Sequence, residues 1–181
     1  MSIDNIVSHL RYVKDFPIKG IKFVDVTTIL KDPKVFAETV DYLYEMYKDK
    51  GITKIAAMES RGYWIGSALA YRLGAGLIPV RKPGKLPAAT FKEVYAKEYG
   101  QDTIEVHQDA FTPDDIVLIH DDILATGGTM KATIDLVKRF STRKVYCNTL
   151  IELTNLPGRS LIPDDVDYTT MLQIDENKLD I

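Results

Sequence analysis

The run IVLIHDDILATGGT at residues 116–129 constrains the fold more than any other part of this sequence. Its first five residues are mostly branched and apolar, which predicts a short buried strand. The run then passes through two aspartates into Thr126, Gly127, Gly128 and Thr129, and a helical pattern follows. Glycines allow a close backbone approach, and successive N–H groups at a helix N-terminus attract anions. The segment therefore predicts a strand, a turn and a helix, with a phosphate site at the turn.

Short apolar runs alternate with helical patterns along the whole chain. This alternation favours an α/β fold with a mostly parallel central sheet flanked by helices. The expected strands are Lys54–Met58, Gly76–Val80, 116–120 and 144–150, and the main expected helices are 63–73 and 130–140. No internal repeat or linker interrupts the pattern, so we expect a single domain over residues 1–181.

Ligands of such folds bind beyond the carboxyl ends of the strands. Three loops follow strands there, at residues 59–62, 81–84 and 121–129. Residues 81–100 are polar, basic and rich in tyrosine, and they show no helical period. Long irregular segments in compact domains are usually functional or mobile.

Composition excludes several classes of protein. The formal net charge is −3, so electrostatics do not favour nucleic acid or an anionic membrane. No apolar run approaches the roughly 20 residues that span a bilayer, and the first residues do not resemble a signal peptide. The single cysteine, Cys147, excludes an internal disulfide and a cysteine-based metal cluster. We expect a cytoplasmic protein with no membrane or nucleic-acid partner.

Asp121 and Asp122 precede the glycine turn, where two carboxylates would repel a phosphate unless they bind something else. The two hydroxyls of a ribose diol fit them, and a Mg²⁺ ion held indirectly also fits. A purely structural alternative is a tight strand-to-helix turn with aspartate as its cap. The distance between the acids and TGGT favours the ligand site.

The other two loops carry cations. Ser60, Arg61 and Gly62 offer backbone donors and a forked guanidinium, a combination that suits a diphosphate. Arg81, Lys82 and Lys85 form a basic segment that either is simply solvated or holds pyrophosphate as a leaving group.

The run at 116–129 resembles the phosphoribosyl pyrophosphate motif of type I phosphoribosyltransferases. The segments DFPIKGIKF, ESRGY, RKPGKLP, VYAKEYG and IELTNLPGR follow the same order and spacing as in the adenine phosphoribosyltransferase family. The resemblance covers most of the chain. It implies the type I phosphoribosyltransferase fold, with residues 1–33 as a base-binding hood and residues 81–107 as a mobile loop region.

The resemblance also implies an activity. Such enzymes serve purine salvage by transferring the 5-phosphoribosyl group from phosphoribosyl pyrophosphate to adenine, which gives AMP and pyrophosphate. Mg²⁺ would be held through substrate oxygens and waters, without a direct protein ligand. Members of the family are usually homodimers.

The implied phosphate and sugar contacts fall on matched positions. The 5-phosphate would be held by Ala125, Thr126, Gly127, Gly128 and Thr129. Asp121 and Asp122 would bind the ribose hydroxyls. Pyrophosphate would face Arg61, Arg81, Lys82 and Lys85.

The implied base site and catalytic loop complete the set. Phe23 would stack on adenine, Ile123 would pack on its other face, and backbone groups near Lys22 and Val24 would read the ring edge. Glu98 and Tyr99 match the loop that closes on the site, and Glu98 is the expected general acid/base for the purine nitrogens.

Two positions depart from the family pattern. Some members have arginine where this chain has Val24, which matters only if the side chain contacts the base or the loop. Ala88 replaces a common glycine, and alanine tolerates positive φ less well, so the loop geometry can differ.

Two alternative functions stay open at this point. One is a hypoxanthine or guanine phosphoribosyltransferase, which the KLP and YAKEYG segments disfavour. The other is a non-enzymatic regulator that senses phosphoribosyl pyrophosphate, which the lack of a basic stripe and the presence of Glu98 disfavour.

Overall fold

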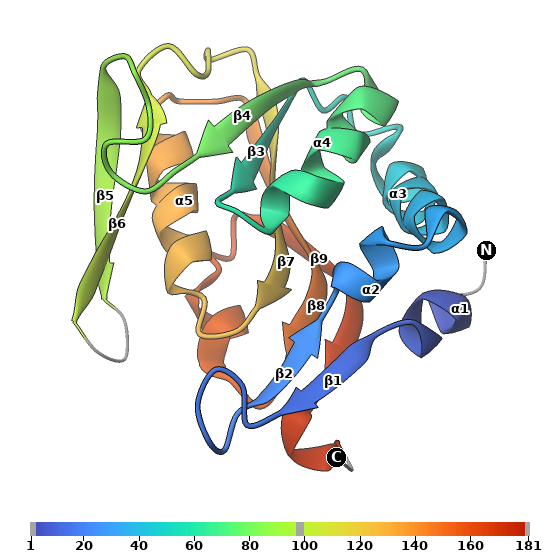
Figure 1. Cartoon of the computed structure of the whole chain (residues 1–181). Coiled ribbons are helices and arrows are strands. Elements are labelled where there is room, and N and C mark those ends of the chain that lie inside the picture. Colours follow the sequence, from blue (N-terminus) through green and yellow to red (C-terminus); the bar gives the residue numbers. More distant parts are fainter. Residues whose placement is uncertain (1–2, 97–99, 180–181) are drawn as a thin grey trace.

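A computed structural model describes residues 3–96 and 100–179 of the chain. Its centre is a five-stranded sheet in the order β4-β3-β7-β8-β9, in which every neighbouring pair is parallel (Figure 1). The strands are β3 (Lys54–Met58), β4 (Gly76–Val80), β7 (Ile116–Leu124), β8 (Lys144–Leu153) and β9 (Asp167–Ile174). The predicted α/β fold with a parallel sheet is confirmed.

Helices cover both faces of this sheet. One face carries α1 (Ile3–Ser8), α2 (Thr27–Leu30), α3 (Pro33–Tyr47) and α4 (Gly62–Leu73), and the other carries α5 (Gly128–Lys138). Asp32 caps α3, because its carboxylate accepts hydrogen bonds from the N–H groups of Lys34 and Val35. Gly74 ends α4 in the left-handed conformation, with φ of 68°.

Side chains alternate across the central strands, and this alternation builds two cores. Ile55 and Leu118 point to the face of α3 and α4, whereas Ala56 and Ile119 point to the face of α5. All four are completely buried. The centre of the sheet is thus apolar on both faces, which fixes the positions of the strand ends that carry polar residues.

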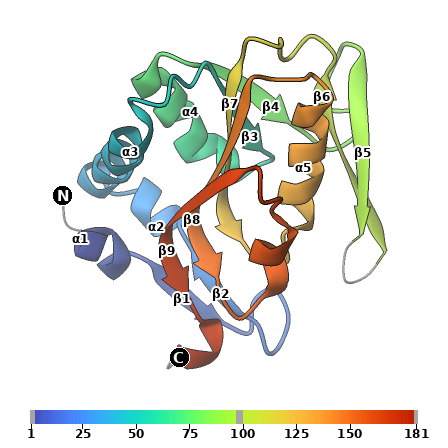
Figure 2. The same cartoon turned by 180° about the vertical axis from the view of Figure 1, so that it is seen from behind.

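Two antiparallel hairpins flank this layered body. The first joins β1 (Arg11–Lys14) to β2 (Lys22–Asp25), and the second joins β5 (Thr90–Ala96) to β6 (Gln101–His107). The β5–β6 hairpin packs outside α5, so the layers run from hairpin to α5, sheet and helices α3 and α4, as Figure 2 shows from behind. Short 3₁₀ helices, η1 (Pro157–Leu161) and η2 (Glu176–Lys178), follow β8 and β9.

The structure corrects two local predictions. Residues 81–100 are not irregular throughout, because β5 occupies most of their second half. The strand expected to end at His120 continues to Leu124, so Asp121 and Asp122 lie within β7 rather than in a loop. In the part of the chain that is described, no helix has the length and apolar character needed to span a bilayer.

Candidate active site

The site lies where the chain changes direction in the sheet. From β3 the chain passes through α4 to β4 at one edge, and from β7 it passes through α5 towards β8 and β9. β3 and β7 are neighbours, so the carboxyl ends of both strands open into one crevice between oppositely directed connections. Ligands of open α/β sheets bind at such a switch point.

The turn after β7 forms a cradle. Gly127 has φ of 82° and directly precedes α5, so the chain reverses tightly and the helix N-terminus faces the crevice. A cavity of about 180 Å³ lies there, lined among others by Ala125, Thr126, Gly127, Gly128 and Thr129. The structure therefore brings together all five residues that were predicted to hold the 5-phosphate.

A second glycine braces this turn from a distant segment. Gly158, in η1, donates its N–H to the Ala125 carbonyl at 3.0 Å. A Cβ on Gly127 would lie 2.7 Å from the Gly158 Cα, and a Cβ on Gly158 would lie 2.2 Å from the Ala125 carbonyl oxygen. Only two glycines allow backbone to touch backbone here, so η1 fixes the shape of the cradle.

The side chains of the two neighbouring aspartates point to opposite sides of β7. Asp121 lines the phosphate cavity, whereas Asp122 is only 2 % exposed and lies 3.1 Å, Oδ2 to Nε, from Arg61. Burial and the Asp122 carboxylate raise the pKa of Asp121 well above its ordinary value. Burial also raises the pKa of Asp122, although the nearby Arg61 charge acts to lower it. A half-buried and a buried acid, both of raised pKa, call for hydrogen-bond donors or a cation as partners.

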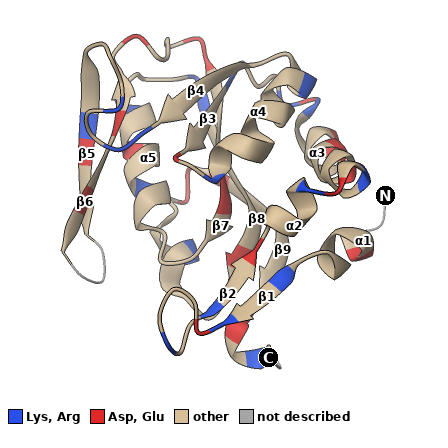
Figure 3. Cartoon of the chain, viewed as in Figure 1, with Lys and Arg blue, Asp and Glu red and all other residues tan. Residues whose placement is uncertain are grey.

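Arg61 occupies the centre of the site. It lines the phosphate cavity, a polar cavity of about 190 Å³ between β3 and β5, and a larger cavity of about 490 Å³ under the β1–β2 hairpin. Gly62 places it there, because a Cβ on Gly62 would lie 2.7 Å from the His120 carbonyl, so α4 begins in contact with β7. Figure 3 shows the basic start of α4 close to the acidic end of β7.

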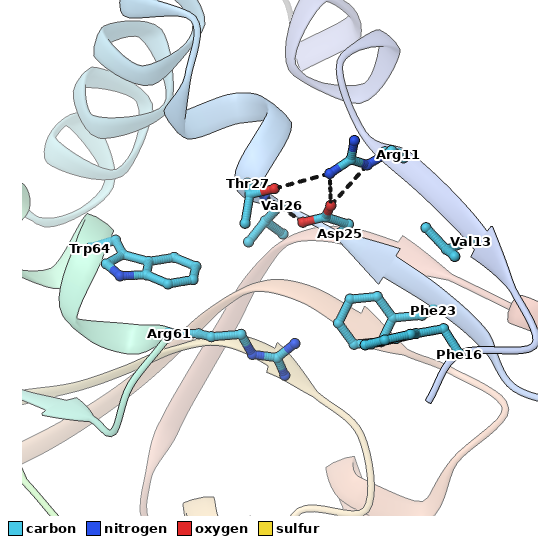
Figure 4. A pocket seen from close by; sticks show the side chains of 9 residues that line it. All are labelled: Arg11, Val13, Phe16, Phe23, Asp25, Val26, Thr27, Arg61 and Trp64. Carbon is cyan, nitrogen blue, oxygen red and sulfur yellow. Dashed lines mark hydrogen bonds and ion pairs between the residues drawn. The ribbon is translucent and has the colours of Figure 1, made fainter. Parts of the chain in front are cut away.

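The large cavity is aromatic and apolar. Phe23 packs edge-on against Phe16 with ring centroids 5.0 Å apart, and the Arg61 guanidinium carbon lies 5.4 Å from the Phe23 centroid. Trp64 forms the opposite wall (Figure 4). A flat heteroaromatic base can stack in such a space, so the geometry suits the role predicted for Phe23.

The polar groups of that cavity mostly satisfy one another. Arg11 donates from Nε to the Asp25 carboxylate at 2.9 Å, and the Asp25 carboxylate also accepts from the Thr27 N–H at 2.8 Å. These contacts join the end of the β1–β2 hairpin to α2. Neither Trp64 nor the Arg11–Asp25 pair was identified from the sequence, because no local motif marks them.

Carboxylates hold two cations of the segment after β4. Arg81 lies 3.3 Å from Glu59, Nε to Oε2, and Lys82 pairs with Asp102. The Lys82 N–H also donates to Glu59 at 2.8 Å, and this bond together with Arg81 keeps the pKa of Glu59 below its ordinary value. Lys82 lines the 190 Å³ cavity beside Arg61, a place suited to pyrophosphate. Arg81 and Lys85 line none of the three cavities.

The remaining predicted residues fall in different places. Val24 is 2 % exposed and its side chain packs in the core, so only its backbone is available to a ligand. Ile123 lines the phosphate cavity and not the cavity of Phe23. Glu98 and Tyr99 lie outside the described residues. Within the described ranges, no group of three or more His, Cys, Asp or Glu side chains is arranged to hold a metal ion.

An α/β fold with a phosphate cradle, paired acids and cations at its switch point defines a class of enzymes that handle phosphorylated ribose. The phosphoribosyl transferase domain model matches residues 25–180. The chain therefore belongs to the phosphoribosyltransferase family, which confirms the resemblance found in its motifs.

The relatives define the branch of that family. An adenine phosphoribosyltransferase of Phocaeicola vulgatus is 55% identical over 174 residues, which cover 96% of this chain and 100% of that protein. The crystal structure of the Rhodothermus marinus enzyme of the same name has a TM-score of 0.89 at 47% identity and covers 95% of this chain and 98% of its own. The Saccharomyces cerevisiae enzyme, solved with adenine and an imino-altritol bisphosphate, has a TM-score of 0.87 at 37% identity, over 93% and 97% of the two chains.

Proposed function

We propose that this protein transfers the 5-phosphoribosyl group from phosphoribosyl pyrophosphate to adenine, giving AMP and pyrophosphate in purine salvage. The observation that carries this proposal is the position of Arg61 between three cavities. One cavity suits a flat base, one suits a phosphate and one suits a diphosphate. A base and a phosphorylated sugar bound there meet at Arg61 and the Asp121–Asp122 pair.

In this reaction the bond between ribose C1 and the pyrophosphate oxygen breaks ahead of attack by the N9 nitrogen of adenine. The cradle of residues 125–129 holds the 5-phosphate at the α5 N-terminus, and Asp121 and Asp122 accept hydrogen bonds from the ribose hydroxyls. Arg61 and Lys82 stabilise the charge that develops on pyrophosphate, with Arg81 and Lys85 joining if the segment after β4 moves. Phe23 orients the base, so that bond formation follows bond cleavage within one closed site.

Mg²⁺ fits this site as a companion of the substrate. Asp121 and Asp122 supply hard oxygen donors, and because desolvation raises the pKa of both, a nearby cation would favour their ionised forms. When bound, the ion would neutralise negative charge on the pyrophosphate group. It would be held through substrate oxygens and waters, with these two carboxylates as the nearest protein groups.

Glu98 is the proposed general acid/base for the purine nitrogens, and Tyr99 the residue that closes beside it. The sequence motif YAKEYG supports both roles, and its first residue, Tyr95, packs on Gly128 at the start of α5. We predict that Glu98→Gln lowers kcat by about 100-fold while changing the KM values for both substrates much less. Steady-state rates with adenine check this, and an unchanged kcat would remove Glu98 from the chemistry.

The assay that tests the function offers adenine, hypoxanthine and guanine separately with phosphoribosyl pyrophosphate and Mg²⁺. Turnover with adenine should exceed turnover with the two 6-oxo purines by orders of magnitude, because a mismatched polar edge is costly in a dry pocket. Comparable rates with hypoxanthine would contradict the assignment of adenine as the substrate. Tight binding of phosphoribosyl pyrophosphate without turnover of any base would identify a sensor instead.

We further propose a single domain with residues 1–33 as the hood over the base and residues 81–107 as the moving loop region. Family resemblance supports a homodimer, which light scattering would test. Mixing the Arg81→Ala and Asp121→Asn variants would show whether Arg81 acts across the dimer, since activity above the sum of the two separate variants requires a hybrid site. A cytoplasmic location is supported by the single, buried Cys147, which suits a reducing compartment.

A further inference from the structure

Tyr95, near the end of β5, lies directly over the phosphate cradle. A Cβ on Gly128 would lie 3.1 Å from the Tyr95 ring carbon Cδ2 and 3.2 Å from the Ala96 carbonyl oxygen. A side chain at position 128 would therefore push the hairpin away from the first turn of α5. The end of β5 thus packs on the turn that carries Gly128 and Thr129.

The Tyr95 hydroxyl connects three groups of the site. Thr129 donates from Oγ1 to it at 3.0 Å, and the Lys82 ammonium donates to it at 3.3 Å. The hydroxyl itself donates to Asp102 Oδ2 at 3.3 Å. Thr129 belongs to the 5-phosphate cradle and Lys82 to the pyrophosphate side, so one phenol bridges the residues for both ends of the sugar substrate.

A bound phosphate would change the hydrogen bonds of Thr129 and Tyr95. Thr129 has one hydroxyl proton, which it gives to Tyr95 in the structure. If Thr129 donates this hydrogen bond to a phosphate oxygen instead, its own oxygen can only accept a hydrogen bond from Tyr95. The Tyr95 proton can then turn from Asp102 to Thr129, and Asp102 keeps Lys82 as its partner. Tyr95 can therefore hold the hairpin on the cradle while Thr129 binds the phosphate.

We propose that Tyr95 is a positioning residue for phosphoribosyl transfer, which couples the docked hairpin and Lys82 to the 5-phosphate through Thr129. The proposal rests on the proposed function for the identity of the ligand. Tyr95 does not touch the reacting atoms. It acts by holding the end of β5 and the Lys82 cation in place beside the cradle.

The test is a double-mutant cycle of Tyr95→Phe and Thr129→Val, with Tyr71→Phe as control. Tyr71 is 90% exposed on α4, and phenylalanine at position 95 keeps the ring on Gly128. Tyr95→Phe should raise the KM for phosphoribosyl pyrophosphate about fivefold, the equivalent of about 1 kcal/mol, and leave the KM for adenine unchanged. In the Thr129→Val background the same change should raise that KM less than twofold. Tyr71→Phe should match the wild type.

An equal effect of Tyr95→Phe in both backgrounds, or none in either, would overturn the proposal. Urea unfolding of all variants separates this from a general loss of stability, which would raise both KM values together. If the wild type shows no turnover, the proposed function fails. Calorimetric titration of the wild type, the two single variants and the double variant with ribose 5-phosphate still measures the coupling. If the double variant raises the dissociation constant by the product of the two single effects, the two residues act independently and the role of Tyr95 is rejected.

Discussion

Gly158→Ala tests the idea that η1 sets the shape of the phosphate cradle. Gly158 is not in the left-handed region, so alanine adds no backbone strain, only a methyl group. That methyl would lie 2.2 Å from the Ala125 carbonyl oxygen and 3.0 Å from the Leu124 Cγ. An ordinary carbon–oxygen contact is about 3.3 Å, so η1 and the cradle must separate by about 1 Å.

The expected consequences are large because the displaced atoms belong to the cradle itself. Overpacking of this kind costs about 1–3 kcal/mol of stability. A displacement of about 1 Å at a binding constellation can lower the rate about 100-fold. We expect kcat/KM for phosphoribosyl pyrophosphate to fall by about 10- to 100-fold, with a much smaller change in the KM for adenine.

The assay is steady-state kinetics with each substrate varied in turn, together with urea unfolding. Gly76→Ala is the matched control, because its added methyl meets only the flexible Lys54 side chain, 3.1 Å from Cδ, far from the cradle. This control should lose little stability and no activity. A folded Gly158→Ala protein with kcat/KM within about twofold of the wild type would refute the bracing role.

Three further predictions concern the acids, the buried histidine and the base. Asp121→Asn should stabilise the protein at neutral pH, which urea unfolding checks, because the raised pKa of Asp121 makes the wild type lose stability as pH rises above 3.8. The same change should weaken phosphoribosyl pyrophosphate binding about 10- to 100-fold in calorimetric titration. Burial lowers the pKa of His120 from 6.5 to about 4, although its hydrogen bond with Asn148 acts in the opposite direction, so the free energy of unfolding should fall by about 3 kcal/mol as pH falls from 6.5 through 4. Urea unfolding at several pH values should show a smaller fall for His120→Asn. Phe23→Ala should raise the KM for adenine about tenfold while the KM for phosphoribosyl pyrophosphate stays the same, and equal increases in initial-rate assays would contradict stacking.

Much of this architecture could be predicted from sequence because its signals are local. Residues 116–129 predicted a strand, a turn and a helix, and the structure shows all three. Hydrophobic runs likewise located β3 and β4 with the bounds that the structure has. Buried parallel strands have a continuous apolar pattern, which is the pattern easiest to recognise.

Other features depend on contacts between distant segments and have no local signal. The strand β5 is half exposed and, among the described strands, pairs with β6 alone, so its sequence has the polar character of a loop. Asp121 and Asp122 extend β7 because β8 pairs alongside as far as Leu124, which overrides their preference for turns. The Tyr95 contacts and the Gly127–Gly158 contact join residues far apart in sequence, so no periodicity could indicate them.

The Gly127–Gly158 contact also has a consequence for how the protein is made. Chains begin to fold from the N-terminal side during synthesis, and the whole motif of residues 116–129 leaves the ribosome well before η1. Until residue 158 has emerged, the turn has its sequence but lacks its brace. We therefore expect substrate to stabilise the turn only once η1 has been made, and fragments that end after α5 to carry the sequence motif without the contact that shapes it.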